Sequence, residues 1–180
     1  MKKRIVMLTG SPHVKGTTSV LADAFCEGAK EAGHDLARFD TAQMKIHPCT
    51  GCNYCRENHE KCIFEDEMLQ IYPHLKEADA VVFVSPLYYF GVTAQLKSAI
   101  DRFFAINIKL RSNPTKVYLL TAGADDEYWV MDGIKAHMKT MCRYLNWSYE
   151  GGVLALEAAV PEDLENTNYL RQARDLGSHL

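Results

Sequence analysis

Four of the six cysteines in this chain lie in one short segment, "HPCTGCNYCRENHEKC", which runs from His47 to Cys62. Their spacing is C-x2-C-x2-C-x6-C, at Cys49, Cys52, Cys55 and Cys62. Four thiolates on a turning loop can hold a [4Fe-4S] cluster, and the same four can hold tetrahedral zinc with His47 or His59 as a spare ligand. The thiols can also stay without metal or form a reversible disulfide. These states remain open at the level of the residues.

A loop rich in hydroxyl groups, "TGSPHVKGTTS" from Thr9 to Ser19, follows a short apolar run and leads into a predicted helix. Backbone N–H groups at a helix N-terminus favour an anion, so this loop is a candidate phosphate site. The alternative is that its serines and threonines only cap the helix. The loop is not a Walker A sequence and lacks G-x-G-x-x-G, which disfavours an ATPase or a conventional dinucleotide fold.

Two further loops follow apolar runs, "SPLYYFGVTAQLKSAIDRF" from Ser85 and "TAGADDE" from Thr121. Tyr88, Tyr89 and Phe90 in the first could be core residues, or they could form a flat apolar wall for a planar ring. The small residues of the second let a ring approach the backbone. A phosphate site, an aromatic wall and a small-residue loop at three strand ends together suit FMN.

The elements that would position these loops alternate between short apolar runs and longer helical patterns, which indicates parallel strands joined by crossover helices. The predicted strands are Arg4–Gly10, "DLARFD" from Asp35, Ala80–Pro86, Lys116–Gly123 and "YEGGVLAL" from Tyr149. The predicted helices are Thr18–Ala32, Glu65–Glu77, Thr93–Phe104, Asp126–Leu145 and Glu162–His179, with Pro73 expected to kink or end the second. We expect one doubly wound three-layer α/β domain whose ligand lies outside the carboxyl ends of the strands.

Composition narrows the class of function. The chain has 180 residues, of which 47% are hydrophobic, and this suits one core better than two. Its 20 basic and 23 acidic residues give a net charge of -3, without the basic footprint of a nucleic-acid partner. No apolar stretch approaches the roughly 20 residues of a membrane span, so we expect a cytoplasmic protein with no membrane partner. In a reducing cytosol, clustered cysteines favour metal binding or redox chemistry.

The whole chain resembles the flavodoxin-like NAD(P)H-dependent FMN reductase family, including its iron-sulfur flavoprotein branch. The resemblance is carried by "GSP...GTTS", "SPLYYFGVTAQLKSAIDR" and the "C-x2-C-x2-C" spacing. It implies a single flavodoxin-like FMN-binding domain over residues 1–180, with a five-stranded parallel sheet in the order 2-1-3-4-5 and a cysteine-rich loop at residues 47–64.

The resemblance also implies where FMN would lie. Ser11, Thr17 and Thr18 would hold the phosphate, Pro86 to Tyr89 would border the isoalloxazine, and Thr121 to Asp125 would close the other side. The full set of expected cofactor-binding residues is Ser11, His13, Lys15, Gly16, Thr17, Thr18, Ser19, Pro86, Leu87, Tyr88, Tyr89, Phe90, Gly91, Thr121, Ala122, Gly123 and Asp125. The family often has Arg and Asn where this chain has His13 and Thr17, so the phosphate would depend on backbone amides and Lys15, with modest FMN affinity.

The activity implied by the resemblance is hydride transfer from NADH or NADPH to bound FMN, then delivery of electrons to a quinone, flavin, azo or nitro compound, or to a protein. The flavin carries that chemistry, so no acid-base residue is nominated. The resemblance further implies a homodimer or a dimer of dimers. Two other classes stay open: a non-enzymatic electron-transfer flavoprotein with FMN and a [4Fe-4S] cluster, and a zinc-stabilised binding module.

Overall fold

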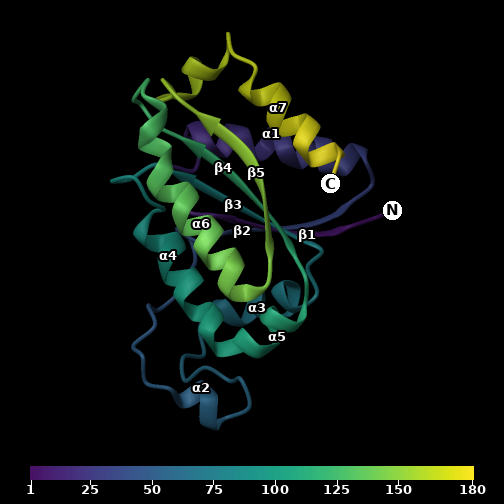
Figure 1. The fold of residues 1–180 in the computed structure, drawn as a ribbon, viewed down its shortest axis with the longest axis vertical. Helices are drawn as coiled ribbons and strands as arrows, with labels where there is room; N and C mark the ends of the chain where they lie inside the picture. Colours follow the sequence, from purple (N-terminus) through teal and green to yellow (C-terminus); the bar gives the residue numbers. More distant parts are fainter.

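A five-stranded parallel sheet forms the centre of the protein, as a computed structural model that describes residues 1–180 shows (Figure 1). The strands are β1 (Arg4–Thr9), β2 (Asp35–Asp40), β3 (Ala80–Pro86), β4 (Lys116–Ala122) and β5 (Ser148–Ala155). Their order is β2-β1-β3-β4-β5, and every neighbouring pair is parallel. The predicted strands, the strand order and the doubly wound fold class are therefore confirmed.

Helices cover both faces of the sheet and complete three layers (Figure 1). On one face lie α1 (Thr17–Glu31) and α7 (Tyr169–Ser178), whose buried residues join one core cluster. On the other face lie α3 (Met68–Lys76), α4 (Ala94–Asp101), α5 (Asn107–Ser112) and α6 (Asp132–Leu145), which pack into the larger cluster. The short helix α2 (Tyr54–Glu57), within the cysteine-rich loop, was not predicted.

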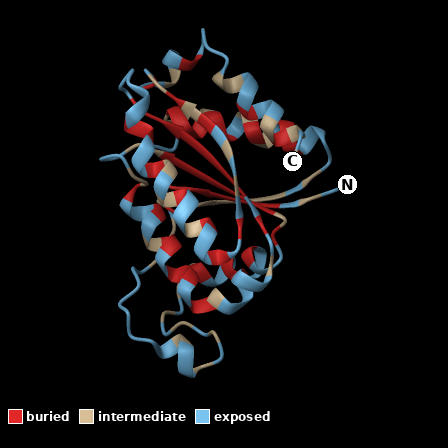
Figure 2. Cartoon of the chain, viewed as in Figure 1, coloured by how far each residue is buried: buried red, intermediate tan, exposed pale blue.

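The inner strands are apolar over most of their length because both of their faces are covered. Ile5 and Met7 of β1 contact the cluster under α1 and α7, while Val6 and Leu8 contact the opposite one. Figure 2 shows this buried sheet between helices whose outer faces are exposed. Strands buried on both sides read as continuous hydrophobic runs, which is why they were recognised from the sequence.

Three predicted helices begin later or end earlier than expected. α3 starts at Met68, not Glu65, and continues past Pro73 to Lys76, so of the two outcomes expected for Pro73, a kink or an end, the end is wrong. α4 ends at Asp101 and passes into a 3-10 helix, η1 (Arg102–Ile106), before α5 begins. Likewise a 3-10 turn, η2 (Tyr128–Met131), precedes α6.

The predicted C-terminal helix Glu162–His179 is wrong, because the chain forms the 3-10 helix η3 (Pro161–Leu164) and then, after a break, α7. The hydroxyl of Thr167 donates to Leu164 O and accepts from Tyr169 N. Such local side-chain bonds compete with the helical backbone pattern. They turn the chain between the two helices.

Two glycines allow α1 and α7 to cross closely. A Cβ on Gly28 would lie 2.0 Å from Arg174 O, and one on Gly177 would lie 2.2 Å from Phe25 O. Backbone therefore packs against backbone, with Arg174 paired to Glu27 at 3.2 Å on the surface. This crossing fixes the position of η3, which precedes α7 in the chain. No helix of the structure combines the length and the apolar character that crossing a membrane requires.

Candidate functional site

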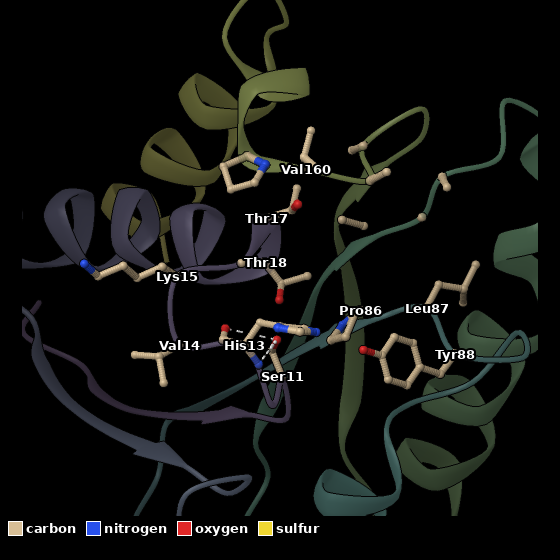
Figure 3. Close-up of a pocket in the computed structure, with 17 residues that line it drawn as sticks. Ser11, His13, Val14, Lys15, Thr17, Thr18, Pro86, Leu87, Tyr88 and Val160 are labelled. Atoms are coloured by element: carbon tan, nitrogen blue, oxygen red, sulfur yellow. Dashed lines mark hydrogen bonds between the residues drawn. The ribbon is translucent and has the colours of Figure 1, made fainter.

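A cavity of about 630 Å³ opens at the carboxyl ends of the central strands, where the strand order reverses. Its volume falls within the range of small-molecule and cofactor sites, and its place is the one expected for a doubly wound sheet. The lining residues are Ser11, His13, Val14, Lys15, Gly16, Thr17, Thr18, Pro86, Leu87, Tyr88, Ala122, Gly123, Ala124, Ala158, Ala159, Val160 and Pro161 (Figure 3). Eleven of the seventeen predicted cofactor-binding residues are among them.

The loop after β1 is folded back on itself by its own polar groups. Ser11 Oγ accepts from His13 N at 3.1 Å, and Gly16 N donates to His13 O at 3.1 Å. Ser19 Oγ also donates to His13 O, at 3.3 Å, and Ser19 does not line the cavity. Ser11 and Ser19 thus shape the loop. The His13 ring reaches toward Pro86, while Lys15 points away from the centre (Figure 3).

The N-terminus of α1 faces this cavity without a side-chain cap. Gly16 is the N-cap residue, and no side chain accepts a hydrogen bond from the first turn, so the alternative that hydroxyls merely cap the helix is not what the structure shows. Thr17 and Thr18 follow, 7% and 2% exposed, and both line the cavity. The first N–H groups of a helix have no partner within it and carry partial positive charge. The cavity therefore has a polar end suited to an anion.

Pro86, Leu87 and Tyr88 form the wall that faces this polar end, with the Tyr88 hydroxyl directed toward Pro86 (Figure 3). The chain then makes a tight turn in which Tyr88 and Gly91 exchange two backbone hydrogen bonds of 3.1 Å. Its central residues, Tyr89 and Phe90, have φ of 45° and 63°. Bulky residues in the left-handed region are strained.

The same turn carries three of the six predicted residues that do not line the cavity. Tyr89 is fully exposed, and Phe90 packs against Trp129 with ring centroids 5.3 Å apart. Neither residue, nor Gly91, lines the cavity. Aromatic character alone could not distinguish Tyr88 from its two neighbours, since the turn decides which ring faces inward.

A buried polar link joins the loops after β1 and β3. Thr93, the N-cap residue of α4, donates from Oγ1 to Gly10 O at 2.7 Å and accepts from Leu96 N at 3.3 Å. Thr93 N donates to Ser85 Oγ at 3.0 Å. A Cβ on Gly10 would lie 2.5 Å from Thr93 Oγ1, so the close approach requires glycine. The link fixes the two loops relative to each other.

The loop after β4 contributes Ala122, Gly123 and Ala124 to the cavity. Thr121 is fully buried beneath them, and its Oγ1 has no hydrogen-bond partner. Asp125 instead accepts from Glu127 N at 2.9 Å in a local turn. Side chains alternate along a strand, so Thr121 and Ala122 point to opposite faces of the sheet.

Six lining residues were missed by the sequence reasoning: Val14, Ala124 and the segment Ala158–Pro161. The last follows β5, whose carboxyl end meets those of β3 and β4 at the same edge of the sheet. The sequence could have predicted this segment, because the residues that follow every parallel strand lie at that edge of the sheet. The segment lacks polar side chains, so nothing in its residue types indicated a binding role.

The four cysteines of the loop surround a second, much smaller cavity of about 30 Å³, together with Asn53, Phe64 and Arg102 among others. All four are free thiols. Burial, and then the nearby charges of Cys62, Cys49 and Cys52, raise the pKa of Cys55. No three His, Cys, Asp or Glu side chains are grouped tightly enough to hold a single metal ion. Four thiols that line one common space are nevertheless the donor set that a [4Fe-4S] cluster requires.

The two cavities share no lining residue. Figure 1 shows α2, beside the cysteines, at the opposite end of the long axis from the chain that leads into α7, which contributes Val160 and Pro161 to the larger cavity. The cysteine loop packs instead against η1 and the start of α5. Within one chain, the cysteines do not form part of the larger cavity.

The fold and the larger cavity define a flavodoxin-like α/β protein with a site at the strand-order switch. Residues 3–152 match the model of the NADPH-dependent FMN reductase family, and the chain belongs to that family. An iron-sulfur flavoprotein of Archaeoglobus fulgidus is 38% identical over 102 residues, which are 57% of this chain and 51% of that protein. The chain spans about half the length of the curated relatives it matches first.

Solved structures show the same fold. An NAD(P)H:quinone oxidoreductase from Methanothermobacter marburgensis superposes with a TM-score of 0.74 at 22% identity, covering 99% of this chain and 96% of that one. An FMN-dependent NADH-azoreductase from Bacillus anthracis, solved in complex with FMN, gives a TM-score of 0.68 at 18% identity over 97% and 98% of the two chains. At these identities the likeness establishes the fold.

Proposed function

We propose that this chain is an FMN-dependent NAD(P)H oxidoreductase, formed by one domain over residues 1–180, that uses the larger cavity as its flavin site. The observation that carries the proposal is the pairing, in one cavity, of the uncapped N-terminus of α1 with an apolar wall from β3 and β4. FMN has a charged phosphate at one end and a planar ring at the other, so it matches both halves. Membership of the FMN reductase family supports the same cofactor.

The polar end would hold the FMN phosphate through the first backbone N–H groups of α1 and the hydroxyls of Thr17 and Thr18. His13 lies beside them and adds a ring nitrogen. Lys15 points away in the structure, so its charge acts at longer range. Because no guanidinium faces the anion, we expect modest FMN affinity.

The apolar end would hold the isoalloxazine between Pro86–Tyr88 and the loop at Gly123. A Cβ on Gly123 would lie 3.3 Å from Leu87 Cδ2, so even a methyl group there would narrow the space for the ring. Bound FMN would supply hydride acceptance from NADH or NADPH and electron delivery to a quinone, flavin, azo or nitro compound, or to a protein. The chain's own part is to orient the ring and exclude water from one face. No acid-base residue is needed for that.

We propose further that Cys49, Cys52, Cys55 and Cys62 would hold a [4Fe-4S] cluster, which would supply single-electron transfer. Because the cysteines and the larger cavity lie apart within one chain, exchange with the flavin would involve a second copy of the chain. The common cavity of the four thiols and the likeness to iron-sulfur flavoproteins support this. These observations equally favour a second candidate function, a non-enzymatic electron-transfer flavoprotein with FMN and the cluster. A zinc-stabilised binding module, in contrast, would leave the larger cavity without a role.

Assembly into a homodimer or a dimer of dimers is part of the proposal, since exposed Tyr89, Phe90 and Trp129 lie beside the wall that would face the flavin ring. Large exposed aromatic groups are typical of interaction surfaces. Light scattering after size exclusion measures the mass of the assembly, and a monomer with FMN bound would contradict this part.

Anaerobic purification, followed by a UV-visible spectrum with flavin, iron, sulfide and zinc measured on one sample, tests the cofactors. Flavin with about four iron per chain supports FMN and the cluster. Flavin without iron leaves a simple FMN reductase, and zinc without flavin uptake contradicts the proposal. Steady-state oxidation of NADH or NADPH then separates an enzyme from a pure electron carrier.

The Thr18→Val variant tests the phosphate end. Loss of one hydrogen bond to a charged group costs about 1.5–3 kcal/mol, so FMN should bind about tenfold or more weakly, as measured by quenching of flavin fluorescence. Thr140→Val, at an exposed position of α6, is the matched control and should bind FMN like the wild type. Unchanged affinity in Thr18→Val would show that the phosphate lies elsewhere.

A further inference from the structure

Arg102, the first residue of η1, is one of the largest fully buried side chains of the protein, at 1% exposure. A guanidinium buried this deeply must be paired, and its partner is Asp66, which accepts from both terminal nitrogens at 2.7 and 3.1 Å. Burial alone would lower the pKa of Arg102, but the hydrogen bonds with Asp66 raise it above its ordinary value. The side chain therefore stays charged.

The other bonds of Arg102 hold the two stems of the cysteine loop, by which we mean the chain just before Cys49 and just after Cys62. Nη1 donates to His47 O at 2.7 Å, two residues before Cys49, and Nη2 donates to Phe64 O at 3.3 Å, two residues after Cys62. The His47 and Phe64 rings stack with centroids 4.0 Å apart. The loop is thus closed at its base by one side chain from a different element.

One donor of Arg102 remains. Four of its five N–H groups are committed to the bonds above, whereas Nε–H is buried and has no partner in the chain. Arg102 lines the small cavity together with all four cysteines. A buried polar group without a partner is rare and calls for an explanation, and an acceptor bound in that cavity would provide one.

We propose that Arg102 is the positioning residue of the four-cysteine site: it clamps both stems of the loop and offers its free Nε–H and its charge to sulfur in the occupied site. The inference rests on the proposed cluster, whose sulfur atoms are hydrogen-bond acceptors and whose thiolate ligands are anionic. Hydrogen bonds to sulfur and nearby charge are among the factors that set the potential of such clusters. Arg102 should therefore make the cluster easier to reduce.

Lysine cannot replace this arginine fully. It keeps the positive charge but has a single nitrogen, which cannot reach His47, Phe64 and Asp66 together and still leave a donor for sulfur. Arg102→Lys therefore keeps the positive charge but loses the several N–H donors of the guanidinium. Arg102→Met loses both the charge and the donors. Arg38→Lys is the matched control, since Arg38 is likewise held in salt bridges, with Asp23 and Asp40, but lines neither cavity.

The clamp is tested on protein freed of metal by chelation, so that its result does not depend on the cluster. Arg56 and Lys61 offer trypsin two sites inside the loop. We expect cleavage there to be about fivefold faster or more in Arg102→Lys, with wild-type circular dichroism and no acceleration in Arg38→Lys. Equal cleavage rates in the wild type and Arg102→Lys would overturn the clamp.

The donor role is tested after anaerobic reconstitution with iron and sulfide, by an EPR-monitored redox titration. The midpoint potential of the cluster should be lower in Arg102→Lys than in the wild type, and lower still in Arg102→Met. The FMN content of these variants and the cluster potential of Arg38→Lys should stay at wild-type values. A wild-type potential in Arg102→Lys would overturn the donor role. If the wild type takes up no iron, the cluster assignment and the donor role both fail, and the trypsin result alone decides the clamp.

Discussion

At the scale of single residues, the turn at Tyr89 and Phe90 runs against local preference. Both residues lie in the left-handed region, where a two-residue turn normally has Asn and Gly. Phe90 gains the contact with Trp129, but Tyr89 is fully exposed and gains no packing. The strain at Tyr89 therefore has no compensation within the chain, and strain of this kind concentrates at functional sites.

The Tyr89→Asn variant should raise the free energy of unfolding by about 1 kcal/mol, because Asn tolerates the left-handed region. Urea denaturation measures the change. Ile108→Asn, at an exposed position in helix α5 with ordinary backbone angles, is the control and should leave stability equal or slightly lower. A destabilised Tyr89→Asn protein would mean that the Tyr89 ring makes a stabilising contact in solution.

At the scale of elements, the packing of the helices fixes the positions of the loops that line the larger cavity. The bond from Thr93 to Gly10 O ties α4 to the loop after β1. The glycine crossing of α1 and α7 sets where η3 begins, and with it Val160 and Pro161. Both contacts join residues far apart in the chain.

Gly28→Ala should therefore be destabilising by about 1–3 kcal/mol, although alanine is the better helix former by about 1 kcal/mol. The new methyl group would meet Arg174 O at 2.0 Å, and backbone cannot move aside as a flexible side chain can. Urea denaturation gives the change in stability, with Lys139→Ala on the exposed face of α6 as a control expected within about 0.5 kcal/mol of wild type. A stabilised variant would show that the two helices separate at little cost.

At the scale of the whole molecule, the cavity suited to FMN and the cavity lined by cysteines lie at separate places. They share no lining residue, and Arg102, which pairs with Asp66, lines the second alone. Sites that are coupled in binding must alter one another's affinity reciprocally.

We therefore expect the Cys49→Ser/Cys52→Ser variant to lose metal uptake while its FMN dissociation constant stays within about twofold of wild type, by fluorescence titration. Thr18→Val should show the reverse pattern, with weaker FMN binding and unchanged metal content. An effect of the cysteine substitutions of about tenfold or more on FMN affinity would reveal coupling, and an assembly that brings one copy's cysteines to another's flavin site would be its natural cause.

The sequence alone determined the five strands and the three loops that carry most of the larger cavity. Parallel strands covered on both faces appear as continuous apolar runs, and the loops after β1, β3 and β4 stand out by their hydroxyl, aromatic and small residues. It also determined the positions of the four cysteines. These features are local, so a pattern within a few residues was enough to find them.

Only the tertiary structure decided which side chains in those loops face the cavity. Ser19 and Thr121 turn inward to the fold, and Tyr89 turns out, because hydrogen bonding, strand alternation and a tight turn set their directions. The contribution of Ala158–Pro161 required the placing of α7 against α1. The role of Arg102 was hidden for the same physical reason: its partners, His47 and Asp66, are 55 and 36 residues away along the chain, and only folding brings them together.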